Sequence, residues 1–520
     1  MPLPTLTRAE VQSQRGPSSA EWSIIIDSTV YEISDFADAH PGGASVLRPF
    51  AGRDATEAFY GFHRHEVLVR YGPSLAVATI RDEEPKIAVT EKGKLSAIPY
   101  AEPAWLTGEK VGGVTPPYYN DSHHHLQRAL RAFVDDELAP EAVANEASGD
   151  YISQSLIDRM SRLGILHMRL GPGPHLCGVD LMDGVMKGDD FDYFHDLIVA
   201  QELARVMARG FQDGNMAGMT IGLTAVLNFA QDETLKKRVA DDVFTGKKKI
   251  CLAITEPAAG SDVAGLQTTA EKTADGKHFI VNGVKKWITN GMFSDYFVTA
   301  VRTSHSLSVL LIPRGEGVET TAIKTSYSPA AGTALVTFDN VRVPIENLVG
   351  KEDKGVHVIL SNFNHERWTM ACGTIRACRV IVEECFKWAN QRIVFGKPLV
   401  DQPVIRQKLA KMMALVESNQ AWLEAITHQM CHMPYQQQAR HLAGPVGLLK
   451  MSITRAAHEI ADESVQIWGG RGLTQSGMGR HIEMFNRTYK FDAILGGAEE
   501  ILADLGVRQA MRSFPPNARL

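Results

Sequence analysis

Two short β-rich runs, residues 22–26 and 30–33, flank the dipeptide Asp27-Ser28 near the N-terminus. Branched and aromatic residues on both sides of such a dipeptide predict a β-hairpin. The stretches that follow alternate polar and apolar residues over short distances, which predicts small helices. We therefore expect a small α+β domain at residues 1–82.

A linker and a helical domain are predicted next. Residues 83–117 are rich in Glu, Lys, Pro and Gly and have no apolar periodicity, as expected of a linker. Residues 118–250 have apolar positions at helical spacing. Leu126, Leu130 and Phe133 fall on one face of the first helix, which we expect to end at Pro140.

The second half of the chain changes from strands back to helices. Strand-like runs fill residues 251–350, and the dipeptides Asp275-Gly276 and Asn282-Gly283, typical of hairpin turns, flank one of them. This pattern predicts an antiparallel β-barrel or sandwich. Residues 351–520 are predicted to be helical, with one helix from about residue 361 to 392, roughly 45 Å long at 1.5 Å per residue. Helices of that length usually pack lengthwise in bundles.

Composition excludes several classes of protein. The residues are 44% hydrophobic and 22% charged, which is ordinary for soluble globular proteins. A chain of 520 residues is too long to fold around one core. A net charge of −6 gives no reason to expect a nucleic acid partner. We expect no membrane span, because no apolar run reaches the ~18 residues required. The six cysteines form no C-x-x-C pair, and the consecutive histidines 123–125 indicate a solvated helix start rather than a metal site.

The two ends of the chain bear on its location. The first residues lack the apolar segment of a secretory signal, and the early acid Glu10 argues against a mitochondrial presequence. The chain ends in Ala518-Arg519-Leu520, a small–basic–leucine tripeptide similar to the peroxisomal S-K-L signal. We expect a peroxisomal location, with the mitochondrion as the alternative.

A candidate haem site lies in the N-terminal domain. The turn His40-Pro41-Gly42-Gly43 precedes His63 by about two dozen residues, and two such imidazoles could bind a haem iron from opposite faces. Such a centre transfers single electrons. The string from this turn through residues 52–59 to His63 resembles the cytochrome b5 family. The resemblance implies haem b with His40 and His63 as iron ligands, and His65 is a nearby alternative to His63.

Four further segments, residues 252–263, 287–291, 391–402 and 466–472, resemble those of the acyl-CoA dehydrogenase family. The resemblance extends over residues 118–510 and implies an α-helical domain, a β-barrel domain and a C-terminal four-helix bundle that bind FAD. In the family the last two segments contact the FAD of a neighbouring subunit, which implies a homodimer or homotetramer. The implied FAD-binding residues are Leu252, Ile254, Thr255, Gly260, Ser261, Trp287, Ile288, Thr289, Arg392, Phe395, Gln402, Gln466, Gly469, Gly470, Ala498 and Glu500.

The resemblance also implies a catalytic base. The family removes an α-proton from an acyl thioester while the flavin takes a hydride, so the protein supplies a carboxylate. Many members carry that glutamate in a C-terminal motif whose matching position here is Gly496. Members that act on long or branched chains carry it before an arginine on the long helix, where this chain has Glu366-Arg367. Glu366 is therefore the predicted base, and Glu499 and Glu500 are nearby alternatives.

The predicted reaction is dehydrogenation of an acyl-CoA to a trans-2-enoyl-CoA, in fatty acid β-oxidation or branched-chain acyl catabolism. The acyl-CoA is expected to contact Ser261, His365, Arg367, Gly496 and Gly497. Electrons would leave to the fused haem, to an electron-transferring flavoprotein or to oxygen. Two alternatives remain: a flavin oxidase that uses oxygen on the same fold, and a haem-binding electron carrier or sensor on an inactive flavin scaffold.

Overall fold

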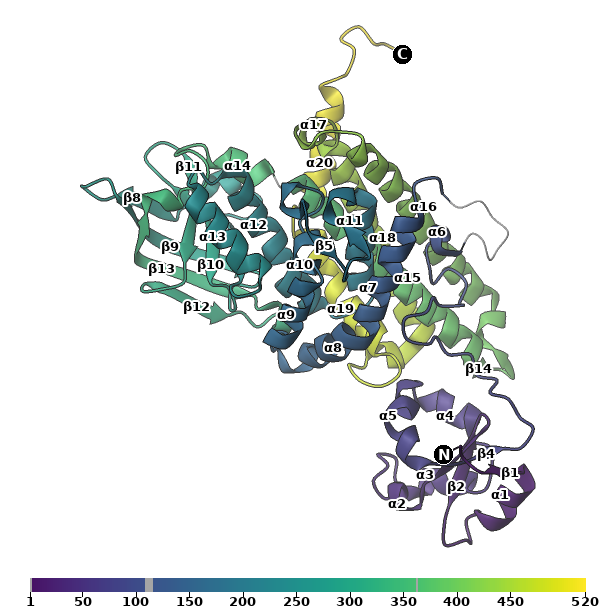
Figure 1. Cartoon of the computed structure of the whole chain (residues 1–520). Helices are drawn as coiled ribbons and strands as arrows, with labels where there is room; N and C mark the ends of the chain where they lie inside the picture. The colour runs from purple at the N-terminus through teal and green to yellow at the C-terminus, as the bar shows by residue number, and fades with distance from the viewer. Residues whose placement is uncertain (1, 108–115, 362) are drawn as a thin grey trace. The chain divides into compact units, whose positions relative to one another are not determined.

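The computed structural model describes residues 2–107, 116–361 and 363–520 (Figure 1). The chain divides into two compact units. The first unit comprises Met1–Glu91, Glu384–Gln407 and Val465–Glu483. The second comprises Lys92–Glu383, Lys408–Ser464 and Met484–Leu520. Among the described residues, no helix has both the length and the hydropathy needed to span a bilayer.

The N-terminal part of the first unit is the predicted α+β domain. Its four strands pair in the order β1-β4-β3-β2. The predicted hairpin is present, with Asp27 at a φ of 57° between β2 and β3. Alternate residues of β2 face opposite sides of the sheet, so Ile25 packs in one core and Ile24 in another. The elements are β1 (Thr5–Leu6), α1 (Arg8–Gln14), β2 (Ser23–Ile26), β3 (Thr29–Glu32), α2 (Ser34–Ala37), α3 (Ala44–Leu47), α4 (Thr56–Phe62), α5 (Glu66–Leu75) and β4 (Ala76–Ile80).

Segments from the C-terminal half complete the first unit. They are the last turns of α15 (Phe363–Gln391), the hairpin β14 (Ile393–Val394) and β15 (Lys397–Pro398), the end of α18 (Ala443–Trp468) and the start of α19 (Arg480–Ile494). Trp388 and Trp468 stack with ring centroids 4.7 Å apart. The guanidinium of Arg471 lies 5.0 Å from the Trp388 ring. These aromatic contacts join segments that are far apart in the sequence.

The second unit begins within the predicted linker, whose residues 108–115 lie outside the described residues. Glu102 is buried and accepts hydrogen bonds from Arg131 at 2.5 Å and from Arg376 at 3.0 Å. Burial alone would raise the pKa of Glu102, but these guanidinium groups lower it to about 2. The residues of the linker around Glu102 are therefore packed against α7 (Asp121–Phe133) and α15 and do not form a free tether.

Helices form the next part of the second unit, as predicted. The expected helix end at Pro140 is wrong, because α7 continues through a π-helical stretch, Val134–Leu138, into α8. Pro140 lies in the first turn of α8, where its missing N–H is tolerated. The helices are α6 (Ala104–Thr107), α7 (Asp121–Phe133), α8 (Ala139–Ser148), α9 (Gln154–Arg162), α10 (Ile165–Met168), α11 (Tyr193–Ala204), α12 (Gly218–Phe229) and α13 (Glu233–Phe244), with the short strands β5 (Asp180–Leu181) and β6 (Met186–Lys187).

The predicted β domain is one seven-stranded sheet, ordered β11-β10-β8-β9-β13-β12 with β7 beside β10. Pairing is mostly antiparallel, but β7 and β8 pair with β10 in parallel. Asp275-Gly276 forms the predicted turn before β9, whereas Asn282-Gly283 does not form one. Asn282 lies inside β9 and bonds to Asn340, where the register with β13 shifts. The strands are β7 (Ile250–Ala253), β8 (Thr269–Lys272), β9 (His278–Ile288), β10 (Tyr296–Arg302), β11 (Leu307–Pro313), β12 (Val318–Ala322) and β13 (Ala334–Pro344).

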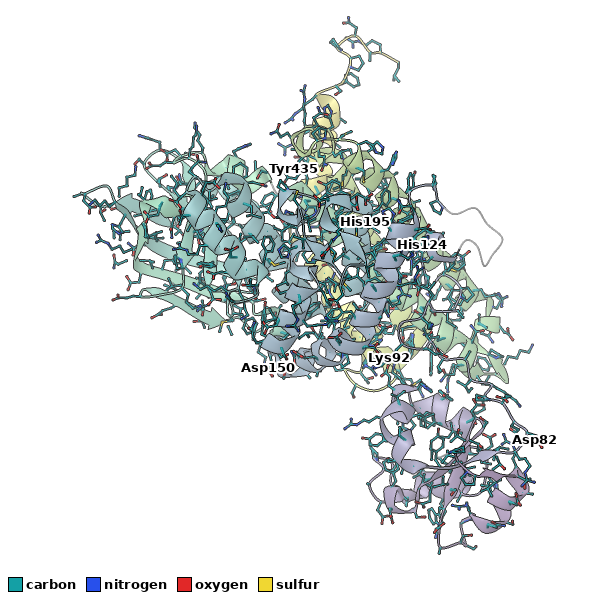
Figure 2. The ribbon with its side chains drawn as sticks, viewed as in Figure 1. Asp82, Lys92, His124, Asp150, His195 and Tyr435 are labelled. Atoms are coloured by element: carbon teal, nitrogen blue, oxygen red, sulfur yellow. The ribbon has the colours of Figure 1, made fainter. Side chains whose placement is uncertain are left out.

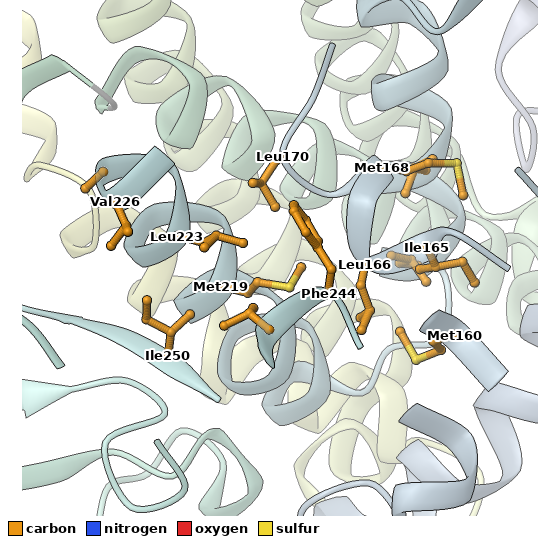
Figure 3. Close-up of a cluster of buried hydrophobic side chains, with 14 of the residues drawn as sticks. Met160, Ile165, Leu166, Met168, Leu170, Met219, Leu223, Val226, Phe244 and Ile250 are labelled. Carbon is orange, nitrogen blue, oxygen red and sulfur yellow. The ribbon is translucent and has the colours of Figure 1, made fainter. Parts of the chain in front are cut away.

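A continuous apolar core joins the helical domain to this sheet. Helices α12 and α14 (Gly355–Ser361) pack on the sheet, α12 against β7 and α14 against β11, and α13 packs against α12 (Figure 1). Figure 3 shows part of the core, where Leu166, Leu223, Phe244 and Ile250 gather from different elements. Burial of this surface fixes the helical domain against the strand that leads into residues 252–263.

The long C-terminal helices pack lengthwise, as predicted. In the second unit Trp368 Nε1 donates to Thr427 Oγ1 at 2.9 Å, which joins α15 to α16. Thr374 Oγ1 donates to Asp492 Oδ2 at 3.0 Å, which joins α15 to α19. The remaining helices of this half are α16 (Pro403–Cys431), α17 (Tyr435–His441) and α20 (Glu499–Met511). Asn362, within the predicted long helix, lies outside the described residues.

Candidate active site and cofactor-binding residues

Glu366, the predicted base, lies in the first turn of α15 and is 8% exposed. Among the described residues, none forms a hydrogen bond with its Oε2 atom. Burial raises the pKa of this carboxyl group, and the nearby cations Arg367 and Lys450 offset only part of that effect. A buried carboxylate whose pKa is raised and whose oxygen is uncommitted can accept a proton at neutral pH.

Gly496, at the commoner base position, lies directly against this carboxylate. A Cβ atom built on Gly496 would stand 3.3 Å from Glu366 Oε1 and 3.0 Å from Met370 Sδ. The φ of Gly496 is 66°, which disfavours any larger residue. A side chain at position 496 and the carboxylate of Glu366 therefore compete for the same space. This steric relation explains why a chain with Glu366 has glycine at 496.

Two cations hold the backbone around Gly496. Arg367 Nε donates to the Gly496 carbonyl at 2.8 Å, and Lys450 Nζ donates to the Gly497 carbonyl at 2.8 Å. Lys450 is buried, and burial lowers its pKa to about 8. Lys450 Nζ also donates to the Leu495 carbonyl, which lies in the same peptide plane as the Gly496 N–H, so that N–H has a fixed direction. Direct contacts of Arg367, Gly496 and Gly497 with substrate stay predictions.

His365 has a partner that the sequence did not indicate. Its Nε2 atom lies 2.7 Å from Asp196 Oδ2, and both side chains are buried. Its ring also stacks on Trp368 at 5.7 Å. Asp196 belongs to α11, a helix in which every residue is buried, so a charged residue there was the available signal. The predicted contact of His365 with substrate stays a prediction.

Strand β7 and the loop after it carry five predicted FAD-binding residues, and a buried ion pair holds the loop. Glu256 accepts hydrogen bonds from the backbone N–H groups of Gln267 at 2.6 Å and Thr268 at 2.9 Å. Lys285, fully buried on β9, donates to Glu256 at 2.7 Å. Sequence reasoning missed Lys285, because its partner is 29 residues away. Leu252, Ile254 and Thr255 are buried or half-buried, whereas Gly260 and Ser261 are exposed.

Trp287 follows Lys285 and Lys286 near the end of β9 and is 51% exposed. Its φ of 65° is rare for a bulky residue, and Lys286 Nζ lies 4.6 Å from its ring centroid. Ile288 is buried and Thr289 half-buried beside it. A strained backbone that holds an indole at the surface fits a platform for a planar ring such as a flavin.

The two histidines predicted to bind iron face each other in the first unit. The rings of His40 and His63 are 5.8 Å apart between centroids. His65, the alternative, instead lies 3.0 Å from the Tyr60 hydroxyl through its Nδ1 atom. Burial lowers the pKa of His63, which favours the neutral imidazole that ligates metals. A Cβ atom on Gly42 would stand 2.9 Å from Val46 Cγ2 and 3.2 Å from the His40 ring, so a larger residue there would displace Val46 and crowd the imidazole.

Comparison with known proteins agrees with this geometry. Models of the acyl-CoA dehydrogenase N-terminal, middle and C-terminal domains match residues 120–247, 251–341 and 353–511. The chain belongs to the acyl-CoA dehydrogenase family. The model of the cytochrome b5-like heme/steroid binding domain matches residues 7–97. The predicted fusion is thereby confirmed.

Relatives of this acyl-CoA dehydrogenase span most of its length. An acyl-CoA dehydrogenase of Emericella nidulans is 38% identical over 431 residues, 81% of this chain and 97% of the relative. The long-chain specific mitochondrial enzyme of Mus musculus is 24% identical over 400 residues, 75% of this chain and 87% of the relative. The structure of a Bacillus anthracis acyl-CoA dehydrogenase complexed with FAD has 26% identity and a TM-score of 0.66, and the match covers 78% of this chain and 69% of that one.

The acyl-CoA dehydrogenase has its other predicted FAD-binding residues in two places. Phe395, at the tip of the β14–β15 hairpin, is 94% exposed with a φ of 50°. An apolar ring in that position fits a contact supplied by another molecule, as predicted from the family. The first unit holds Arg392, Phe395, Gln402, Gln466, Gly469 and Gly470, and the second holds Ala498 and Glu500 at the start of α20.

A cluster of histidines in the acyl-CoA dehydrogenase's helical domain is explained by helix capping. The rings of His123 and His195 stack with their centroids 3.9 Å apart, and both side chains share the Oδ1 atom of Asp192 (His195 is labelled in Figure 2). The Nδ1 atom of His123 accepts the Asn120 N–H, and its Nε2 atom donates to Asp192. His195 contacts Asp192 through Nδ1 and the Ser122 hydroxyl through Nε2. The ring nitrogens of both histidines are therefore taken up by hydrogen bonds, and the proton on Nε2 of His123 makes that atom unfit for a metal. The expected solvation is wrong for His123, which packs against α11 and is buried, but His125 is exposed.

Proposed function

We propose that this acyl-CoA dehydrogenase oxidises a saturated long-chain or branched acyl-CoA to the trans-2-enoyl-CoA. The observation that carries the proposal is the carboxylate of Glu366, buried and with one oxygen uncommitted, in the space that Gly496 leaves free. Removal of an α-proton needs such a base within reach of the thioester.

Residues of this chain account for the proton transfer. Glu366 takes the α-proton, and burial keeps its pKa raised so that the proton is held. The backbone N–H of Gly496 donates to the thioester oxygen, where charge develops. Lys450 fixes that N–H by binding the Leu495 carbonyl of the same peptide unit, and Arg367 binds the carbonyl that follows it. Both cations also lie near the charge that Glu366 carries before the reaction.

FAD is the first cofactor, and when bound it accepts the hydride from the β-carbon. Thr255 and Ser261 would hold its polar edge, and Trp287 would pack against its ring. Glu256 and Lys285 would keep the loop of Thr255 in position. Exposed Phe395 and Arg392 would serve the FAD of a neighbouring subunit, so we propose a homodimer or homotetramer.

Haem b is the second cofactor and supplies a one-electron centre. His40 and His63 would hold its iron, among the apolar side chains of Leu47, Phe59 and Leu68. We propose this centre as the relay by which electrons leave the dehydrogenase. An electron-transferring flavoprotein and oxygen are the competing acceptors.

Two observations support the proposed substrate class and location. A base on α15 resembles that of members acting on long or branched chains, and one relative is long-chain specific. The tripeptide Ala518-Arg519-Leu520 ends a stretch, residues 511–520, that is exposed throughout and open to a receptor. We therefore propose a role in peroxisomal β-oxidation or branched-chain catabolism.

Anaerobic spectra of the full-length holoenzyme test these roles. Saturated acyl-CoAs of increasing length and a branched one are added, and the flavin and haem bands are followed. We expect the longer or branched substrates to bleach the flavin and the haem band to be reduced afterwards. Glu366→Gln should slow bleaching by about 10²- to 10⁴-fold, the range for loss of a general base. The exposed Glu233→Gln serves as the control.

Several outcomes would reject parts of the proposal. Unimpaired bleaching in Glu366→Gln would rule out this base. A native flavin that no acyl-CoA bleaches would rule out dehydrogenation and favour a carrier or sensor. Fast reoxidation of the reduced flavin by air would identify an oxidase, and a haem band that stays oxidised would rule out the relay.

A further inference from the structure

The turn that carries His63 also bears the contacts between the haem domain and the C-terminal segments of the first unit. Arg64, the next residue, donates to the two carboxylate oxygens of Glu384 at 2.6 and 2.8 Å. It also donates to the carbonyl oxygen of Met478 at 3.1 Å. A bidentate guanidinium–carboxylate pair with a further backbone contact has a defined geometry.

This ion pair is buried, unlike an ordinary surface salt bridge. The side chain of Arg64 is 17% exposed and that of Glu384 is 9% exposed. His481 lies 3.7 Å from the same carboxylate. Burial would raise the pKa of Glu384, but Arg64 and His481 hold it well below its usual range. Because a buried charge without a partner is costly, each side of this contact needs the other.

Two further contacts flank the pair. The side chain of Glu66 binds Arg480, and the carbonyl of Tyr60 accepts from the side chain of Gln391. The haem-domain residues that make these contacts lie between positions 60 and 66, so each is within three positions of His63. Their partners lie at the end of α15 and at residues 478–481, in the segments that hold Arg392 and Gly469.

We propose that the turn of His63 is the docking surface of the haem domain, and that this chain's own C-terminal helices are its partner, with Arg64 as the docking residue. The haem domain then presents the side of one predicted iron ligand to the dehydrogenase helices rather than to a separate carrier. The contacts described above are the whole basis for the docking. A role of the docking in electron transfer depends in addition on the function proposed above.

Hydrogen exchange of the full-length holoenzyme tests the docking directly. Amides at the end of α15 and in the first turn of α5 are compared in native protein, Arg64→Ala and Arg70→Ala. Arg70 is exposed on α5 and makes none of the docking contacts, so it is a matched control. We expect Arg64→Ala to speed exchange in both segments by roughly a hundredfold or more, as for a buried pair that loses one partner. Arg70→Ala should behave as native.

A charge exchange guards against a trivial loss of folding. Arg64→Glu should speed exchange as well, and combining it with Glu384→Arg should restore much of the protection. An unchanged haem spectrum shows that the haem domain of each variant is folded. Equal exchange in Arg64→Ala and Arg70→Ala would overturn the proposal, and so would a double variant without any recovery.

Stopped-flow spectra separate this inference from the proposed function. With a substrate that bleaches the native flavin, Arg64→Ala should leave bleaching unchanged and slow reduction of the haem band by about tenfold or more, as for a weakened docked state. Haem reduction at the native rate in an undocked variant would overturn a role in electron passage. If no acyl-CoA bleaches the flavin, the proposed function fails, while hydrogen exchange still decides the docking.

Discussion

Helix α15 carries two buried glutamates with opposite environments. Glu366 has one oxygen without a hydrogen bond among the described residues, and burial raises its pKa. Glu384 receives two hydrogen bonds from Arg64, and its pKa is held well below its usual range. Both side chains are less than a tenth exposed. Burial alone therefore does not decide what a carboxylate does.

The difference lies in where the compensating charge is placed. Arg64 binds Glu384 directly, so proton uptake there would break a buried pair. Near Glu366 the cations bind backbone carbonyls instead: Arg367 the carbonyl of Gly496, and Lys450 that of Gly497. Their charge stabilises the site without occupying the carboxylate. An uncommitted buried carboxylate is suited to catalysis, and a fully paired one to holding two segments together.

Moving the base is the change with the largest expected effect. Glu366→Gly should slow flavin bleaching by up to about 10⁴-fold, because no general base remains. Adding Gly496→Glu should recover at least roughly a hundredfold of that loss, since the two positions address the same space. Anaerobic bleaching by a long-chain acyl-CoA measures both.

The single variant Gly496→Glu is the control for this exchange. It crowds two carboxylates into one space, so it should be slower than native. A double variant as slow as Glu366→Gly would show that position 496 does not reach the α-proton. In that case the assignment of Glu366 as the base would lose this support, and only the role of Glu384 in the comparison of the two glutamates would stand.

Much of the fold could be predicted from local patterns. Asp27 and Gly276 both adopt positive φ at their turns, so turn chemistry located two hairpins correctly. Asn282-Gly283 has the same chemistry but lies within β9, because pairing with β13 places a bulge there. Pro140 failed as a helix end for a similar reason, since the π-helical stretch before it lets the chain continue. Long-range packing decided both cases.

The candidate site was predictable only where a motif carried it. Glu366 and Gly496 were found through family resemblance, and the steric relation between them appears only in the structure. Asp196 is 169 residues from His365, and Arg64 is 320 residues from Glu384. Such pairs leave no periodicity or spacing in the sequence. A buried charge is visible from sequence only as a polar residue in an apolar stretch, as at Asp196 in α11.

Neutralising each glutamate should have opposite consequences for stability. Glu384→Gln leaves Arg64 buried without its charge partner, and we expect the free energy of local opening at the end of α15 to fall by about 3–5 kcal/mol. Glu366→Gln removes a buried charge that has an oxygen without a partner, so the free energy of local opening at the start of α15 should stay the same or rise. Hydrogen exchange in the two parts of α15 measures both. Equal effects would contradict the distinction between them.

The pH dependence of the two groups should also have opposite signs. The folded pKa of Glu366 is raised above its ordinary 4.5, so its favourable contribution is complete below pH 4.5 and is lost as pH rises through the folded pKa. That of Glu384 is lowered, so its contribution is present above pH 4.5 and is lost as pH falls toward the folded pKa. Melting temperatures of native protein, Glu366→Gln and Glu384→Gln across this range measure the two contributions. The rate of flavin bleaching should rise about tenfold per pH unit below the pKa of Glu366 and then level off.

The smallest predicted effect comes from one methyl group. In Gly496→Ala the new Cβ atom would stand 3.3 Å from Glu366 Oε1 and 3.0 Å from Met370 Sδ, at a φ of 66°. Met370 is flexible and can move aside, so the backbone strain of about 1–2 kcal/mol is the main cost. We expect flavin bleaching to slow by roughly tenfold. The pH at which the bleaching rate levels off should also rise, because the methyl group further desolvates the carboxylate. Gly477→Ala, which also has a positive φ but meets no atom within 4 Å, is the matched control. If the two variants slow bleaching equally, the backbone strain of a non-glycine residue at positive φ accounts for the whole effect. The space beside Gly496 would then not be what distinguishes Glu366 from Glu384.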